Sequence, residues 1–124
     1  MPRSEILRMR TRTLGPRAAP DRQLLNQPEV AKVFVDGLLE AFRSGTGGAH
    51  HDAALFARPW GFSLEVIIAK VHLWHGERDE YVPISVGRFV ADAIPNCNAS
   101  YLTEEGHLTL ARNHIRSVLG TLLS

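Results

Sequence analysis

The sequence is poor in three features that would set it apart from ordinary globular proteins. Its one cysteine, Cys97, cannot form an internal disulfide or supply a cluster of thiolate ligands to a metal, and it fits a reducing compartment. No apolar run approaches the ~18 residues that suggest a transmembrane helix, and we expect no signal peptide. The formal net charge is +1, which favours neither nucleic acid nor an acidic partner. We therefore expect a cytoplasmic protein that binds neither membrane nor nucleic acid.

What is present is the composition of one globular domain. The 124 residues are 44% hydrophobic and 22% charged, which is enough for one compact core and too short for two domains. Residues 1–22 carry six arginines against two acidic residues. Arginine-rich starts also occur in organelle-targeting peptides and nucleic-acid-binding arms, but this one lacks interleaved aromatic residues and serine-rich character. We expect a basic, solvated lead-in over 1–22, with a short helix starting at Ser4.

The next segment, residues 23–69, is predicted to be helical. Asp21 could cap a short helix over "RQLLNQ". The clearest helix is expected over 28–43, because Pro28 suits a first turn and apolar residues then recur at every fourth position. The stretch "SGTGG" ends this helix, and "AHHDAALFA" predicts another short one. We expect "WGFSLEVI", which follows, to form a packed loop with one helical turn.

The second half predicts an α/β fold. Short apolar runs over 70–75 and 99–104 indicate two buried strands. A core-facing helix is predicted after Pro83, and a last helix over 109–123. Strand, helix, strand and helix at this spacing predict two parallel strands joined by a right-handed crossover. The last helix is expected to turn one apolar face to the core, made of Ala111, Ile115, Val118, Leu119 and Leu122.

Two polar residues follow the predicted strands. Asp79 lies in the loop after the first strand, and His107 lies after the second. Because the carboxyl ends of parallel strands meet at one edge, we expect these side chains to lie together. An acid beside a histidine can fix its tautomer and stabilise the imidazolium that forms when it takes a proton. Taken singly, Asp79 could instead be a turn residue that binds backbone amides, and His107 an ordinary histidine.

The stretches "VHLWHGERDEYVP" and "IPNCNASYLTEEGHLTL" resemble the C-terminal end of the α/β-hydrolase fold. The resemblance implies a partial α/β-hydrolase fold, with 70–124 as its C-terminal βαβα unit and 23–69 as a cap-like segment. It also implies ester or amide hydrolysis through a Ser-His-Asp triad, in which Asp79 is the acid and His107 the base. Lys70 stands where relatives often carry proline. Nearby Glu77 and Glu80 could replace the acid, but the spacing of the motif favours Asp79.

The third member of such a triad has no counterpart in this chain. The family places its nucleophile in a G-x-S-x-G elbow, and the sequence contains no such motif. The expectation is therefore a C-terminal part of the fold that is inactive alone and binds a small acyl substrate only if the missing half is supplied. Two alternatives stay open: a non-catalytic interaction or oligomerisation module, and half of a split hydrolase complemented by another chain. The exposed edge of the first strand predicts a homo-oligomer.

Two aromatic residues are candidates for substrate binding. Trp60 and Phe62 could line a pocket beside the cap-like segment. Plain packing in the core explains their size and hydrophobicity equally well.

The remaining polar groups predict no metal and no cofactor. His72 and His75 are three positions apart on a strand, so they point to opposite faces and cannot chelate one ion. We expect His75 to pack near the loop beneath Asp79. The cluster at 50–52, two histidines and an aspartate, reads as a solvated loop, and Cys97 lacks the setting of a nucleophilic thiol.

Overall fold

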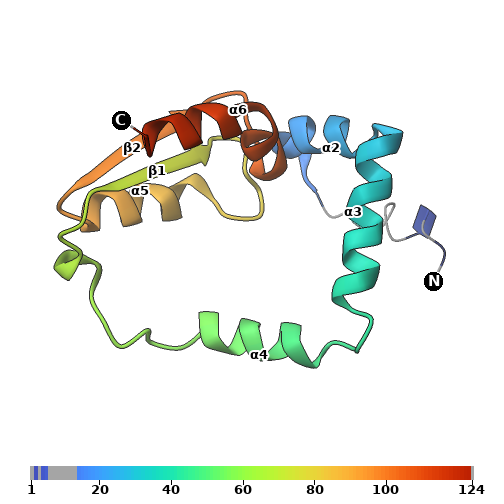
Figure 1. Cartoon of the computed structure of the whole chain (residues 1–124), viewed down its shortest axis with the longest axis horizontal. Helices are drawn as coiled ribbons and strands as arrows, with labels where there is room; N and C mark the ends of the chain where they lie inside the picture. The colour runs from blue at the N-terminus through green and yellow to red at the C-terminus, as the bar shows by residue number, and fades with distance from the viewer. Residues whose placement is uncertain (1, 3, 6–13, 124) are drawn as a thin grey trace.

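The structure is a computed structural model that describes residues 2, 4–5 and 14–123 (Figure 1). Most of the predicted basic lead-in, and most of the short helix expected from Ser4, lie outside the described residues. Residues 14–123 contain two 3-10 turns, five α-helices and two strands, in the order η1 Pro16–Ala18, α2 Ala19–Leu25, α3 Pro28–Ala41, α4 Gly47–Phe56, η2 Leu64–Val66, β1 Val71–Gly76, α5 Ile84–Ala93, β2 Cys97–Leu102 and α6 His107–Thr121.

The sheet has two parallel strands, and the chain is of the α/β class that the sequence predicts. Val71 pairs with Cys97 at one end and Gly76 with Leu102 at the other. The crossover helix α5 packs on one face, where Gly87 lies against the ring of His75. Successive residues of a strand point to opposite faces, so Trp74 points to the other face, toward α6. The two helices therefore sandwich the sheet.

The second strand and the last helix both begin two residues earlier than predicted. The second strand begins at Cys97 and ends at Leu102, two residues earlier than expected, because 103–106 form a turn whose Glu105 carbonyl accepts a hydrogen bond from Arg78 N–H at 2.9 Å. The last helix begins at His107 rather than at 109. Its first N–H groups are bound by a side chain from a distant helix.

The N-terminal part of the described chain belongs to the core. Leu14, Ala18 and Leu25 form a buried cluster, against which Phe34 and Leu108 pack. Residues 14–22 were predicted to be solvated, yet their apolar positions fill the space between α2, α3 and α6. The boundary predicted between residues 22 and 23 falls inside α2.

The segment from α4 to η2 stands apart from this core. All ten residues of α4 are exposed, and Figure 1 shows the helix away from the sheet and its two flanking helices. The loop predicted to be packed is open, since Trp60 and Phe62 are 60% and 56% exposed. In the described part of the chain α4 makes no extensive contact with another element, and its Leu55 and Phe56 line an open cavity with Trp60 of the loop that follows. Within the described ranges, no helix is both long enough and apolar enough to cross a membrane.

The last helix turns a different face inward from the one predicted. The side chains that lie partly covered against the sheet are Leu110, His114, Val118 and Thr121. Of the five residues predicted to face the core, only Val118 does so, and Ala111, Ile115, Leu119 and Leu122 are exposed. The physical reason is the width of the sheet, because two strands can cover only one flank of a helix.

Candidate acid–base site at the carboxyl ends of the strands

The candidate site lies where the loops after β1 and β2 meet. These loops are in backbone contact, since Glu77 N–H donates to Leu102 O and Arg78 N–H to Glu105 O, both at 2.9 Å. Gly76 makes this approach possible, because a Cβ there would lie 2.3 Å from Glu105 O. The end of β1 and the turn before α6 are thereby held together.

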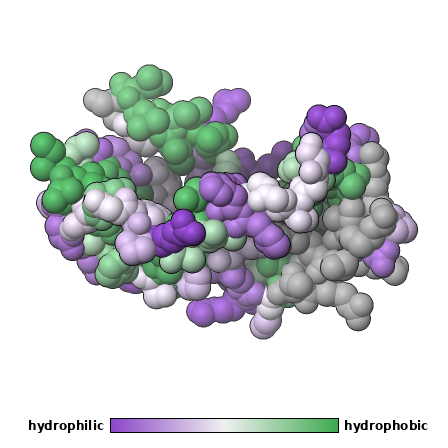
Figure 2. Space-filling model, turned by 90° about the horizontal axis from the view of Figure 1, so that it is seen from below, coloured by the Kyte–Doolittle hydropathy of each residue, from purple (hydrophilic) through white to green (hydrophobic). Residues whose placement is uncertain are grey.

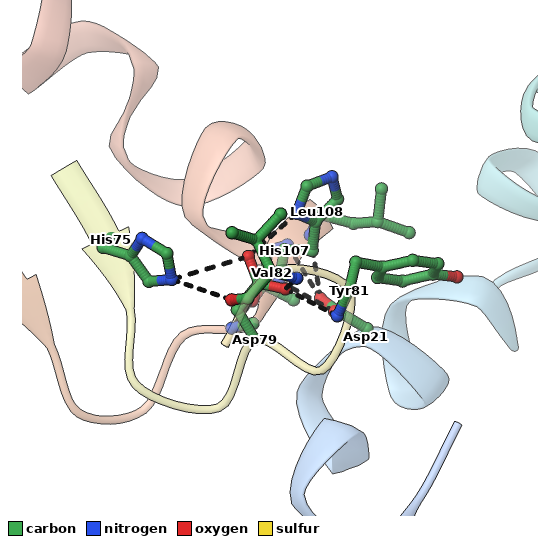
Figure 3. A network of polar contacts seen from close by, with 9 residues as sticks. Asp21, His75, Asp79, Tyr81, Val82, His107 and Leu108 are labelled. Carbon is green, nitrogen blue, oxygen red and sulfur yellow. Dashed lines mark hydrogen bonds and ion pairs between the residues drawn. The ribbon is translucent and has the colours of Figure 1, made fainter. Parts of the chain in front are cut away.

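Asp79 and His107 are brought into direct contact at this point. His107 Nδ1 lies 2.8 Å from Asp79 Oδ2, and Figure 3 shows the two side chains facing each other. The carboxylate oxygen can only accept, so Nδ1 carries a proton, and in the neutral ring Nε2 holds the lone pair. The Asp79 side chain is 7% exposed, whereas that of His107 is 43% exposed. The arrangement therefore offers a basic nitrogen to a ligand and hides the acid that orients it.

The second carboxylate oxygen of Asp79 organises the loop itself. Oδ1 accepts hydrogen bonds from the N–H groups of Tyr81 and Val82, each at 2.8 Å. Asp79 is therefore both a turn residue that binds backbone amides, through Oδ1, and the partner of His107, through Oδ2. The loop that needs Asp79 for its shape also fixes the direction in which Asp79 meets the imidazole.

His75 supports this loop from below, where the sequence predicted it. Its Nε2 lies 2.9 Å from Val82 O and 4.0 Å from Asp79 Oδ2. A carbonyl oxygen only accepts, so His75 donates through Nε2. A Cβ on Gly87 would lie 2.5 Å from His75 Nδ1, so the glycine of α5 leaves room for the ring.

A small cavity opens beside the His107 ring. It has a volume of about 250 Å³ and is lined by Trp74, His75, Gly76, Asp79, Val82, Gly106, His107 and Leu110. The rings of Tyr81 and His107 lie close together, with their centroids 5.0 Å apart. The volume falls below the usual range of about 300–1,000 Å³ for ligand pockets, so the cavity suits a small group. Of the residues that the structure describes, no serine, threonine or cysteine lines this cavity.

Asp21 has a different role from the one predicted for it, which was to cap its own helix. It lies inside α2 rather than at its start, and it is completely buried. Its carboxylate accepts hydrogen bonds from the N–H groups of His107, Leu108 and Thr109 at 2.8, 3.0 and 3.1 Å. Asp21 therefore caps α6 and not its own helix. The sequence held one signal of this: the α6 N-cap is Gly106 and the first turn has no acid, so the cap must come from elsewhere.

The two glutamates considered as replacement acids have other partners. Glu80 accepts hydrogen bonds from Gly15 N–H at 2.5 Å and Ala18 N–H at 3.2 Å. Glu77 lies 3.6 Å from Arg88 on α5. Neither contacts His107, so in the described structure Asp79 is the acid at the imidazole.

Glu105, in the turn before α6, carries a shifted pKa. Burial by itself raises the pKa of this carboxyl, but hydrogen bonds from Thr109, His114 and Asn113 outweigh burial and hold the pKa below its ordinary value. The contact with His114 Nε2 is 2.9 Å long. Glu105 thus fastens the turn to the body of α6.

The structure does not bring Trp60 and Phe62 to His107. Their rings contact each other, with centroids 6.1 Å apart. Trp60 lines a separate open cavity with Leu55 and Phe56 of α4, and neither aromatic residue lines the cavity at His107. In the described residues, no group of three or more His, Cys, Asp or Glu side chains is placed to hold a metal ion.

Comparison of the chain with protein-family models, with curated proteins and with solved structures found no match in any of the three.

Proposed function

We propose that His107 and Asp79 form the acid–base pair of a serine-hydrolase-type site, whose nucleophile is supplied by a polypeptide segment outside these 124 residues. The observation that carries the proposal is the 2.8 Å contact between His107 Nδ1 and Asp79 Oδ2 at the carboxyl ends of adjacent parallel strands. The resemblance of 71–110 to the end of the α/β-hydrolase fold agrees with it.

In this role His107 Nε2 takes the proton of an attacking hydroxyl and later returns it to the leaving group. Asp79 stays ionised, keeps the proton on Nδ1 and stabilises the imidazolium that forms between the two steps. The small cavity of about 250 Å³ beside the ring favours a short acyl group over a long one.

The chain alone lacks two contributions to such a reaction. Its sequence contains no G-x-S-x-G motif, and among the described residues no hydroxyl or thiol side chain lines the cavity. The sequence also contains no HGGG motif of the kind that supplies oxyanion-hole amides. Without a nucleophile and without donors for an oxyanion, most of the acceleration of acyl transfer is lost. We expect only slow, imidazole-like hydrolysis from this chain.

The first test is hydrolysis of p-nitrophenyl acetate by the purified chain and by His107→Ala. The expected rates differ by less than about tenfold, because an oriented base without a nucleophile gains little. Rapid turnover that His107→Ala abolishes would show a complete site within the chain.

The second test is affinity capture with the purified chain. It should recover a partner that contains G-x-S-x-G, and mixing the two proteins should restore hydrolysis that depends on His107. Capture of a partner without that motif would contradict the split-hydrolase role.

A second candidate function is a non-catalytic module that associates with its own copy. It is favoured by the apolar residues exposed on the helices beside the sheet, Val86, Phe89, Ile115, Leu119 and Leu122. Within the described residues β1 pairs only with β2, so its outer edge is open. Figure 2 shows hydrophobic side chains gathered in patches on one face of the molecule. This candidate predicts a dimer, which light scattering detects.

A further inference from the structure

We propose that Asp21 is a positioning residue for His107, so that helix α2 is part of the acid–base site and not merely of the core. The proposal rests on the function proposed for the His107–Asp79 pair. It concerns a residue 86 positions away from His107 in the chain.

The environment of Asp21 is unusual for a carboxylate. The side chain is fully buried, and the partners found for it are backbone N–H groups at the start of α6. A helix N-terminus carries partial positive charge and unpaired donors, which together stabilise a buried anion. The neighbouring cation does not compete, since Arg22 donates instead to the carbonyl oxygens of Leu14 and Gly15.

One of the three N–H groups belongs to His107 itself. Asp21 Oδ2 holds the backbone of this residue at 2.8 Å, while Asp79 Oδ2 holds its ring at 2.8 Å. Two acids, one from α2 and one from the loop after β1, therefore hold the backbone and the ring of the same residue (Figure 3). Gly106 completes the fit, because a Cβ there would lie 2.5 Å from the Asp21 carboxylate. A shift of Asp21 would move His107 relative to Asp79.

A second link joins the other half of the pair to the same helix. Glu80, next to Asp79, accepts hydrogen bonds from Gly15 and Ala18, which lie at η1 directly before α2. The loop that carries Asp79 holds the start of α2, and α2 in turn holds the start of α6. The distance between acid and base is therefore set through α2 as well as by their direct contact.

The test separates positioning from simple helix capping. Asp21→Asn keeps one acceptor oxygen for Leu108 and Thr109 but turns an NH₂ group toward His107 N–H, so it removes the contact with His107 selectively. Leu25→Ala is the matched control, since Leu25 is also fully buried on α2 but makes no hydrogen bond to α6. The readout is the tautomer ratio of His107 in the folded protein, measured from ring ¹⁵N chemical shifts.

In the unmodified protein we expect the Nδ1–H tautomer of His107 to dominate. In Asp21→Asn we expect the ratio to shift toward the Nε2–H form that free imidazole side chains favour, by a factor of about 2 to 13, which corresponds to the net contribution of one hydrogen bond. Leu25→Ala should lower stability and leave the ratio unchanged. An unchanged ratio in folded Asp21→Asn would reduce Asp21 to a helix cap and overturn the proposal.

Two further outcomes keep the test decisive. If the unmodified protein already favours the Nε2–H form, the function proposed for the pair fails, which is distinct from failure of the Asp21 proposal. If Asp21→Asn does not fold, Glu80→Gln carries the same test from the other link, with Glu77→Gln as its control in the same loop. Glu80→Gln should shift the tautomer ratio in the same direction, and no shift would overturn the proposal.

Discussion

At the scale of single residues, the site depends on close backbone approaches that only glycine allows. Gly76, Gly87 and Gly106 each face an atom of the site within 2.5 Å of where their Cβ would lie. None of the three has a positive φ, so the constraint is steric and not conformational. The neighbours are the Glu105 carbonyl, the His75 ring and the Asp21 carboxylate, which are the groups that position the two loops.

Gly76→Ala should therefore damage the junction of the loops. The added methyl group meets the carbonyl oxygens of Glu105 and Gly106 at 2.3 and 2.7 Å, and backbone cannot rotate away as a side chain can. We expect a loss of about 1–3 kcal/mol in the free energy of unfolding, measured by urea denaturation. The control is Gly37→Ala, at an exposed position of α3 with nothing within 4 Å of the added Cβ, which should stabilise by roughly 0.5–1 kcal/mol. Equal effects of the two substitutions would contradict the steric role of Gly76.

The ionisation of a single residue, Glu105, makes the stability of the folded protein depend on pH. The pKa of Glu105 is lower in the folded protein than in the unfolded chain, so its contribution to stability is present above the ordinary value of 4.5 and is lost as the pH falls through the lowered folded pKa. Glu105→Gln should cost about 0.2–1 kcal/mol near neutral pH. The cost should shrink in acid, at pH values below 4.5, as the carboxylate of the folded parent protein becomes protonated.

The comparison uses urea denaturation of both proteins near neutral pH and below pH 4.5. Glu40→Gln removes an exposed ion pair to Arg43 and serves as the control, which should change stability little at either pH. A cost of Glu105→Gln that stays constant with pH would show that lost packing, and not the ionised carboxylate, is responsible.

At the scale of elements, the sequence predicts which two loops meet at the carboxyl ends of the strands, but it does not predict which helices contact each other. Asp79 and His107 could be expected at one edge because parallel strands bring their carboxyl ends together, a rule that needs only local patterns. The contact from Asp21 to α6 spans 86 positions, and no local pattern encodes which distant carboxylate reaches an uncapped helix. The missing cap at Gly106 indicates only that some acceptor is needed.

The sequence pattern also fails to predict which face of α6 is buried. The apolar stripe predicted to face the core is mostly exposed on α6, because the burial of a stripe depends on how many strands lie beneath it. Two strands cover the flank that carries Leu110, His114 and Val118 and leave Ile115 and Leu119 exposed. Periodicity therefore gives the direction of an apolar face and not its partner.

At the scale of the whole molecule, exposed apolar side chains lie on both helices that flank the sheet. On α5 they are Val86 and Phe89, which are 45% and 67% exposed. On α6 and at its C-terminal end they are Ile115, Leu119 and Leu122. Within the described residues β1 pairs only with β2, so its other edge is open between these two helices.

A second copy of the chain, related by a twofold axis, can cover the open edge of β1 and the apolar side chains beside it. Antiparallel pairing of two β1 edges would satisfy the open backbone groups of both chains at once and bury the apolar side chains beside both edges. We expect the chain of 13.8 kDa to elute with about twice that mass in size-exclusion chromatography with light scattering.

Substitutions in the proposed interface test this arrangement. Replacing Leu119 and Leu122, which are 52% and 68% exposed, with Glu should convert the dimer to a folded monomer, because neither side chain is buried within a single chain. Val33→Glu, on α3 and 72% exposed, should leave the dimer intact. A stable, non-exchanging monomer would contradict the twofold arrangement, and a dimer that survives the double substitution would place the interface on another face.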